Sequence, residues 1–148
     1  MSNLSSTFDI LRGWPNGCAL WWEFQQKAAV TPNISEGEVV AVEAGTAGKG
    51  VVNRYDSALA TGTNMDNPWL VIQGKDQFDG QFTGTLTCLK LRTGVVFKIA
   101  TVLTMSVGNL VWSDGGGIFT NVDPGSSAPA IGKVIQIDPV NGWVVIES

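Results

Sequence analysis

Short runs of β-forming residues, separated by glycine-rich turns, recur along most of this chain. From residue 35 onward they follow one another at intervals of about 8–15 residues, with almost no helical periodicity. The chain contains 18 glycines without the three-residue period of collagen, and glycine readily adopts the positive φ that tight turns require. This spacing predicts an all-β fold, either a sandwich or a small barrel.

Turn signals predict three hairpins in this part of the chain. The Asn141-Gly142 step at the end of Asp138-Pro-Val-Asn-Gly is a strong hairpin signal. The glycines of Ser113–Gly117 can supply the positive φ that a tight hairpin turn needs. The expected hairpins pair Thr85–Leu91 with Val95–Leu103, Asn109–Trp112 with Ile118–Val122, and Lys133–Ile137 with Trp143–Ile146. Further strands are expected at Val39–Val42, Val51–Val52 and Trp69–Ile72.

Residues 1–34 differ in character from residues 35–148, and we predict an extended N-terminal arm followed by a single β domain. The first segment holds three of the six tryptophans. Its apolar positions fit neither the helix nor the strand period, so at most one short element is expected there. Two arrangements stay open: the arm caps its own core, or it docks on a neighbouring subunit. The predicted anchors are Trp14, Trp21, Trp22 and Phe24.

Charge and hydropathy argue against several partners and compartments. The net charge is −4 and the nine Lys and Arg are scattered singly, whereas binding to a nucleic-acid backbone needs a basic stripe. The apolar runs are far shorter than the roughly 18–20 residues that span a membrane. The first ten residues lack the pattern of a signal peptide. We expect a protein that is made in a reducing cytosol, with Cys18 and Cys88 as free thiols, although a disulfide between them stays open.

The residue types present offer little for catalysis or metal binding. The chain has no histidine and only two cysteines, which removes the commonest general base and the usual zinc sites. Most aspartates lie in predicted turns, where they bond to local backbone N–H groups. The segment Gly45–Gly50 fails as a phosphate loop, because Glu43 and Gly50 stand where Gly and Ser or Thr are needed. We predict no catalytic residues, no metal and no cofactor.

The C-terminal third resembles capsid decoration (cement) proteins of tailed bacteriophages. The resemblance rests on Ser106-Val-Gly-Asn-Leu-Val-Trp-Ser-Asp-Gly-Gly-Gly-Ile-Phe-Thr, Ile131-Gly-Lys-Val-Ile-Gln-Ile-Asp-Pro and Gly142-Trp-Val-Val-Ile. Ser35-Glu-Gly-Glu-Val-Val-Ala-Val resembles the opening strand of that family. The resemblance implies a compact β-barrel or β-tulip-like domain, trimers at capsid three-fold positions, and an N-terminal arm that reaches neighbouring capsid subunits. The tryptophan-rich residues 14–24 depart from the arms of that family.

These observations favour a non-enzymatic virion structural protein that decorates and stabilises the phage head. The expected partners are the major capsid protein and further copies of the chain in a homotrimer, with neither nucleic acid nor membrane bound directly. The expected location is the capsid surface, after synthesis in the host cytoplasm. Two alternatives remain: another phage structural β-module, such as a tail-tube or head-completion protein, or a carbohydrate-binding module that uses exposed tryptophans.

Overall fold

The computed structural model describes nine segments of the chain, and these form eleven strands. The described segments are residues 8–12, 21–43, 50–58, 68–75, 82–91, 94–100, 104–116, 118–125 and 128–148. Their strands are β1 (Phe8–Arg12), β2 (Trp21–Gln26), β3 (Val39–Glu43), β4 (Val51–Arg54), β5 (Trp69–Lys75), β6 (Phe82–Lys90), β7 (Val96–Ala100), β8 (Leu110–Ser113), β9 (Phe119–Thr120), β10 (Gly132–Asp138) and β11 (Trp143–Glu147). The described residues contain no helix, which confirms the predicted all-β fold.

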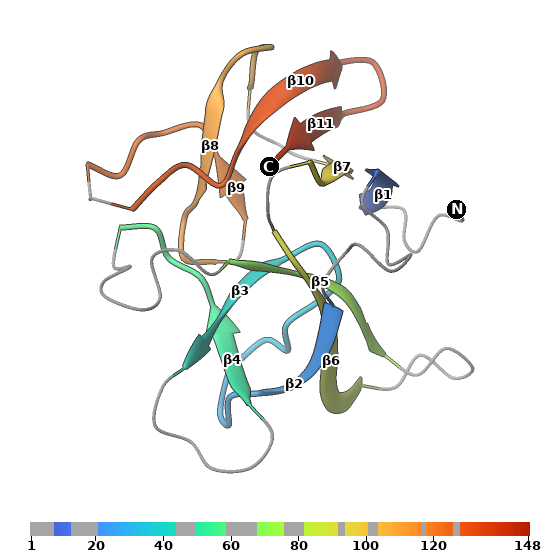
Figure 1. Ribbon diagram of the computed structural model, residues 1–148, viewed down its shortest axis with the longest axis vertical. Coiled ribbons are helices and arrows are strands. Elements are labelled where there is room, and N and C mark those ends of the chain that lie inside the picture. Colours follow the sequence, from blue (N-terminus) through green and yellow to red (C-terminus); the bar gives the residue numbers. More distant parts are fainter. Residues whose placement is uncertain are drawn as a thin grey trace.

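The strands divide into two units, a closed barrel and an open sheet. The barrel has the order β2-β4-β3-β5-β6, and the six-stranded sheet has the order β1-β7-β11-β10-β8-β9. Figure 1 shows the sheet in its upper half and the barrel in its lower half. All pairs are antiparallel except β2 with β4, where two parallel pairings close the barrel. The predicted compact barrel is confirmed, and a second β unit accompanies it.

Local turn chemistry accounts for the two hairpins nearest the C-terminus. Strands β10 and β11 pair antiparallel around a turn in which Gly142 has φ 72°, a conformation that costs glycine little. Strands β8 and β9 pair in the same way, with Trp112 opposite Thr120 and Gly115 at φ 91°. Both hairpins are confirmed with the strands that the sequence predicts.

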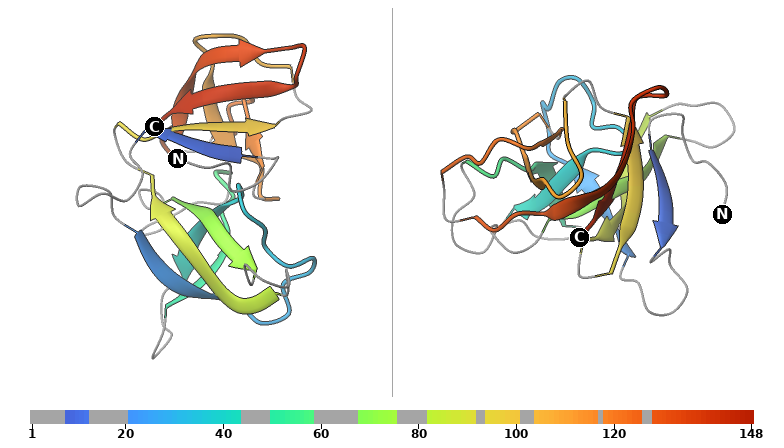
Figure 2. Two further views of the ribbon diagram at one scale, coloured as in Figure 1. Left: turned by 90° about the vertical axis from the view of Figure 1, so that its right-hand side faces the viewer. Right: turned by 90° about the horizontal axis from the view of Figure 1, so that it is seen from above.

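The predicted hairpin between residues 85–91 and 95–103 is wrong. Strand β6 pairs with β2 and β5 in the barrel, whereas β7 pairs with β1 and β11 in the sheet. The chain therefore passes from one unit to the other between them, as the two views of Figure 2 show. A glycine turn signal marks a change of direction but carries no information about which strand becomes the hydrogen-bonded neighbour.

The expected arm also differs from the structure. Residues 1–34 contain two described strands, β1 in the sheet and β2 in the barrel, and not one short element at most. Strand β2 pairs with β6 along residues 21–25, so it is part of the barrel wall. Its aromatic residues do not alternate between buried and exposed positions, which is why the strand period is hidden in the sequence.

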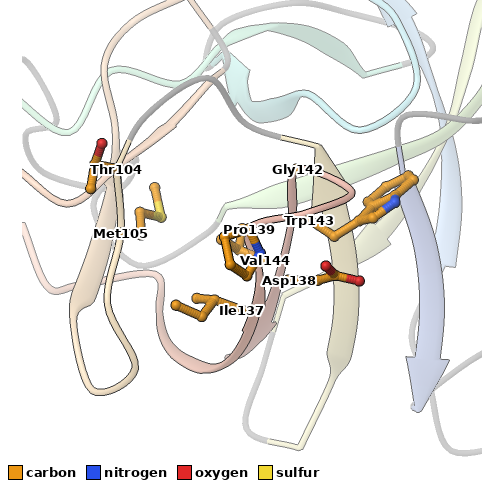
Figure 3. Close-up of a pocket in the computed structure, with 8 residues that line it drawn as sticks. All are labelled: Thr104, Met105, Ile137, Asp138, Pro139, Gly142, Trp143 and Val144. Carbon is orange, nitrogen blue, oxygen red and sulfur yellow. The ribbon is translucent and has the colours of Figure 1, made fainter.

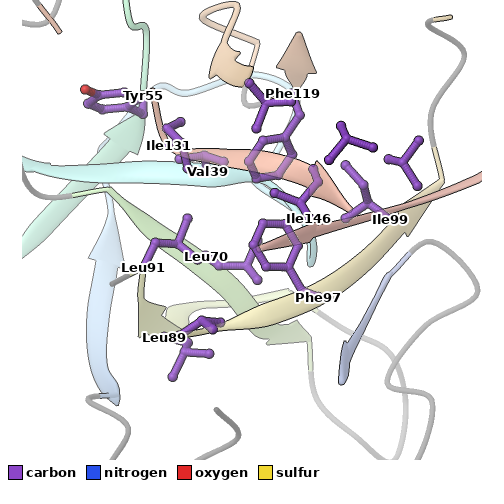
Figure 4. Packing of buried hydrophobic residues seen from close by; sticks show 14 of the residues in the cluster. Val39, Tyr55, Leu70, Leu89, Leu91, Phe97, Ile99, Phe119, Ile131 and Ile146 are labelled. Atoms are coloured by element: carbon purple, nitrogen blue, oxygen red, sulfur yellow. The ribbon is translucent and has the colours of Figure 1, made fainter. Parts of the chain in front are cut away.

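Two hydrophobic cores follow from this division. The barrel interior holds seven buried residues: Phe24, Ile34, Val40, Val52, Val71, Leu86 and Cys88. The larger core lies between the barrel wall and the sheet and takes residues from both units, as Figure 4 shows for Val39, Leu70 and Leu89 against Phe97, Phe119 and Ile146. Successive strand residues face opposite sides, so Leu70 packs in the shared core while Val71 packs inside the barrel.

Two buried serines join the units at one edge of the shared core. The Ser113 backbone N–H donates to Ser57 Oγ at 3.0 Å, and the Ser57 N–H donates to the Ser113 carbonyl at 3.1 Å. The Ser113 hydroxyl donates to the Tyr55 carbonyl at 2.5 Å. These bonds satisfy polar groups that burial would otherwise leave unpaired at a cost of about 1–3 kcal/mol each. They fix strand β8 against the chain that follows β4.

An ion pair holds the loop between β2 and β3 over the barrel. Arg54 Nε lies 2.7 Å from Glu38 Oε1, and both side chains are largely buried. The same guanidinium donates to the Pro32 carbonyl at 2.9 Å. A second pair, Lys27 with Glu43, has a similar distance of 3.0 Å but lies on the surface. Burial gives the first pair more influence on stability than the second.

Candidate interaction surface

The structure separates the aromatic residues that the sequence predicts as anchors. Trp21 is 51% exposed and Trp22 is 65% exposed on strand β2. Phe24, two residues further along, is only 7% exposed. Trp14 lies outside the described residues. Trp21 and Trp22 therefore remain candidates for partner binding, while Phe24 does not.

Phe24 is a core residue of the barrel, and its prediction as an anchor is corrected. Its ring meets the Trp69 ring edge-on, with the centroids 4.9 Å apart. Gly50 leaves the space for this ring, because a Cβ there would lie 3.0 Å from Phe24 Cδ1. The sequence left open whether these aromatics pack on the core of their own chain or dock on a neighbouring subunit. Phe24 packs on the core of its own chain.

The closure of the barrel explains why the two tryptophans stay exposed. Within β2, strand β4 pairs only with Gln25 and Gln26, at the C-terminal end of the strand. Trp21 and Trp22 precede that seam and pair with β6 alone among the described strands. The tryptophan pair, as we call Trp21 and Trp22, thus lies on the part of β2 before the seam, with its two exposed side chains on opposite faces of the strand. Large aromatic surfaces of this kind are the usual anchors of protein interfaces.

A larger set of exposed apolar residues lies in the sheet unit, and none of them was predicted from the sequence as a contact residue. The set consists of seven of the described residues between positions 104 and 148: Val107, Leu110, Ile118, Val122, Ile135, Ile137 and Val140. Several occupy turns beside Gly, Asp or Pro. One feature of the sequence could have predicted these exposed residues. Aliphatic residues stand at turn positions, where polar residues are usual.

The hairpin tip between β10 and β11 displays the most exposed of these residues. Val140 is 90% exposed, on a turn that side-chain hydrogen bonds hold. The Asn141 backbone N–H donates to Asp138 Oδ1 at 3.1 Å, and Asn141 Nδ2 donates to Asp138 Oδ2 at 2.8 Å. The Asn141 side-chain bond, followed by its backbone bond, holds the pKa of the Asp138 carboxyl below its usual value. Asp138 therefore stays ionised and keeps the turn in place at neutral pH.

A hollow lies beside this hairpin. Its volume is about 220 Å³, and it is lined by Thr104, Met105, Ile137, Asp138, Pro139, Gly142, Trp143 and Val144. Figure 3 shows Thr104 and Met105 on one side and the hairpin residues on the other. Most of this lining is apolar, with Asp138 as the ionised group. On the neighbouring strand, Lys98 Nζ lies 4.4 Å from the centre of the Trp143 ring, a cation–π contact.

Three of the described aspartates accept hydrogen bonds from backbone turns. Asp56 and Asp114 face each other in an isolated β-bridge, but Asp56 Oδ1 accepts the Ala58 N–H at 2.9 Å and Asp114 Oδ1 accepts the Gly116 N–H at 2.9 Å. Asp123 likewise accepts the Gly125 N–H at 2.8 Å. These bonds confirm the predicted role of the turn aspartates. Among the described residues, no group of three or more potential ligands could hold a metal ion.

The one described cysteine is a structural residue. Cys88 is a free thiol, fully buried inside the barrel, and burial raises its pKa to about 12. A thiol in this state is a poor nucleophile, because the thiolate is the reactive form. Cys18 lies outside the described residues. In the part of the chain that the structure describes, no helix is long and apolar enough to cross a membrane.

The chain was compared with protein-family models and with curated protein sequences. No family model matches the chain, and no curated protein sequence matches it. The arguments about function therefore rest on the residues and their geometry.

Proposed function

We propose that this protein is a non-enzymatic virion structural protein that binds and stabilises the head of a tailed phage. The observation that carries the proposal is the tryptophan pair, exposed on a strand whose next inward residue, Phe24, is fixed in the barrel core. The backbone of the pair is held by its pairing with β6, so little backbone entropy is lost when a partner covers the two side chains. In this proposal the partner is the major capsid protein.

The C-terminal resemblance supports the same proposal. The stretch that carries most of it begins shortly before β8 and runs through strands β8–β11. These four strands are consecutive neighbours in the sheet, in the order β11-β10-β8-β9. A decoration protein needs no reaction. It needs a stable scaffold with surfaces for several neighbours, since many weak contacts across a lattice add up to tight attachment. As a homotrimer on the capsid surface, each assembly would bridge several capsid subunits.

Co-sedimentation with purified phage heads that lack this protein tests the proposal. The double variant Trp21→Ser/Trp22→Ser should lose affinity for heads by about 30-fold or more, which corresponds to about 2 kcal/mol for hot-spot aromatics. Its urea unfolding midpoint should match that of the unaltered protein, because both side chains are exposed. Lys27→Ser, which changes an exposed side chain just after β2, is the control. Equal head binding by the double variant and the control contradicts the proposal.

Deletion of residues 1–34 is unsuitable for this test. It would remove β2 from the barrel and β1 from the sheet, so loss of binding would only report unfolding. Point substitutions at exposed positions leave the strand pairing intact and separate binding from folding.

A carbohydrate-binding module is the second candidate, and the same tryptophan pair favours it. Exposed indole rings offer flat apolar faces on which sugar rings can stack. Addition of bacterial or plant polysaccharides should then change the tryptophan fluorescence of the protein but not that of Trp21→Ser/Trp22→Ser. A saturable change of this kind, together with no binding to heads, would replace the first proposal with the second.

A further inference from the structure

The turn between β10 and β11 contains a chemically reactive step. Asn141 is followed by Gly142, and both residues are exposed to solvent. Asparagine is a thermally labile residue, because the backbone nitrogen of the next residue can attack its side-chain carbonyl carbon. We propose that Asn141 is a site of spontaneous deamidation and that Asp138 restrains this reaction in the folded protein. Neither part of the proposal depends on head binding.

The reaction needs only this chain and water. The Gly142 backbone nitrogen loses its proton and forms a bond to Asn141 Cγ, and the Cγ–Nδ2 bond breaks with release of ammonia. The product is a succinimide ring that joins the two residues. Water then opens the ring at either carbonyl, which leaves an aspartate or an isoaspartate at position 141. In sum, one side-chain amide and one water become one carboxylate and one ammonium ion.

Gly142 offers an accessible nucleophile. It has no side chain to shield its nitrogen, and a Cβ at this position would meet no atom within 4 Å beyond its chain neighbours. Its φ of 72° is a conformation that costs glycine little and strains residues with a side chain. The turn therefore favours the residue that leaves the attacking nitrogen most open.

Asp138 holds the Asn141 amide by its nitrogen. Asn141 Nδ2 donates to Asp138 Oδ2 at 2.8 Å, and the Asn141 backbone N–H donates to Asp138 Oδ1 at 3.1 Å. Ring closure needs Asn141 Cγ and the Gly142 nitrogen about 3–3.5 Å apart, with the nitrogen above the plane of the amide. Rotation of the amide toward this arrangement competes with the bond from Nδ2. The bond therefore favours the unreactive side-chain conformation.

The negative charge of Asp138 acts in the same direction. Attack on Cγ places negative charge on Asn141 Oδ1, and a carboxylate nearby raises the energy of that charge. Asp138 is ionised at neutral pH, since the Asn141 side-chain bond lowers its pKa. Solvent and the positive charge of Lys98 weaken the repulsion, so the hydrogen bond is the stronger restraint.

Deamidation would change the hairpin tip itself. A carboxylate at position 141 cannot donate to Asp138, so the side-chain bond of 2.8 Å is lost. Two negative charges then lie across the turn and repel each other. An isoaspartate also lengthens the backbone by one carbon, next to the exposed Val140. How long this turn keeps its native form therefore depends on Asp138.

Incubation of the purified full chain at neutral pH, followed by digestion and mass spectrometry, tests the proposal. The rate at which Asn141 is converted is compared with that in a synthetic peptide of residues 136–146, which has the same sequence without the fold. Conversion in the full chain should be about 10-fold slower or more. Asp138→Ala should accelerate it about 5-fold or more, as expected for the loss of an exposed hydrogen bond to a charged group.

Two controls separate a local effect from a general one. Asp123→Ala removes another turn carboxylate of the sheet unit, which accepts the Gly125 N–H at 2.8 Å, and should leave the conversion of Asn141 unchanged. The Asn16-Gly17 step lies outside the described residues and serves as an internal reference in the same digest. Its conversion should be equal in the unaltered protein and in both variants.

Three outcomes overturn the proposal. One is conversion of Asn141 in the full chain as fast as in the peptide, or no conversion in the peptide at all. The second is an equal rate in Asp138→Ala and Asp123→Ala, and the third is an acceleration that Asn16 shares. If Asp138→Ala lowers the urea unfolding midpoint, Asp138→Asn takes its place, because it keeps the shape of the side chain without the charge. Its acceleration should be smaller but in the same direction.

Discussion

The barrel and the sheet differ in how many of their large apolar residues are exposed to solvent. The barrel closes on itself and encloses a core of its own, and among its described residues only Trp21 and Trp22 are large exposed hydrophobics. The sheet is open, ends in β1 and β9, and packs one face on the barrel wall. The other seven large exposed hydrophobics belong to this unit. Closure gives every barrel strand two hydrogen-bonded neighbours, whereas β1 and β9 are edge strands of the open sheet.

The two units also depend on each other for the burial of their apolar residues. The barrel contributes Val39, Leu70 and Leu89 to the shared core, and the sheet contributes Phe97 and Phe119. Neither contribution would be buried without the other. The sheet has no further core among the described residues, whereas the barrel has its interior. We therefore expect the two units to unfold together, with the sheet relying on the barrel more than the reverse.

Truncation in the shared core should have the largest effect. Phe97 is fully buried, with its ring 5.3 Å from that of Phe119. Phe97→Ala should lower the free energy of unfolding by about 3–5 kcal/mol, measured by urea unfolding. If the units unfold as one, the same variant should also speed chemical labelling of Cys88 inside the barrel, in a Cys18→Ser background. Unchanged labelling of Cys88 would mean that the barrel stands independently of the sheet.

Removal of the buried ion pair should have the next largest effect. Arg54→Met takes away the bonds to Glu38 and to the Pro32 carbonyl, and it leaves a largely buried carboxylate without its partner. The free energy of unfolding should fall by about 2–3 kcal/mol, measured by urea unfolding. Lys27→Met breaks the exposed pair and should cost less than about 1 kcal/mol. Equal effects of the two substitutions would show that burial does not set the strength of these pairs.

The barrel interior should make stability depend on alkaline pH through Cys88. Burial raises the pKa of this thiol from 9.0 to about 12, so the folded state resists losing the proton that the unfolded state releases. The stabilising contribution is complete below pH 9 and is lost as pH rises toward 12. Between pH 8 and pH 10 the protein should lose about 1 kcal/mol that Cys88→Ala does not lose. Parallel pH profiles for the two proteins would argue against a dry barrel interior.

The smallest effect is expected at the hairpin tip of the sheet. The folded pKa of Asp138 lies below 3.8, chiefly because of the Asn141 side chain. Its contribution to stability is present above pH 3.8 and is lost as pH falls through the folded value. Asn141→Ala should raise the pKa of Asp138 toward 3.8, measured by NMR titration, with little change in the unfolding midpoint at neutral pH. An unmoved pKa would show that another group holds the carboxylate.

The parts of the fold that local chemistry determines could be predicted from the sequence. Gly142 follows Asn141 in a turn that needs positive φ, and the hairpin of β10 and β11 forms there. The glycine turn between β8 and β9 was predictable for the same reason. Residues that are close together in the sequence determine both turns. The two hairpins can therefore be predicted without knowing which distant strands pair with them.

Pairing between distant segments could not be predicted in this way. Strands β6 and β7 follow each other along the chain, but their neighbours are set by packing in two separate units. The same limit affects the candidate surface. Phe24 and Trp22 have similar character in the sequence, and only the position of the seam with β4 at Gln25 places one inside and leaves the other exposed.

The order of strands along the chain has a consequence for synthesis on the ribosome. All five barrel strands lie between residues 21 and 90 without interruption, so every pairing of the barrel is available once that stretch has left the exit tunnel. Strand β1 is made before the barrel strands, yet its neighbour β7 begins only at residue 96. Strand β1 must therefore wait, unpaired with β7, until the whole barrel sequence has been translated.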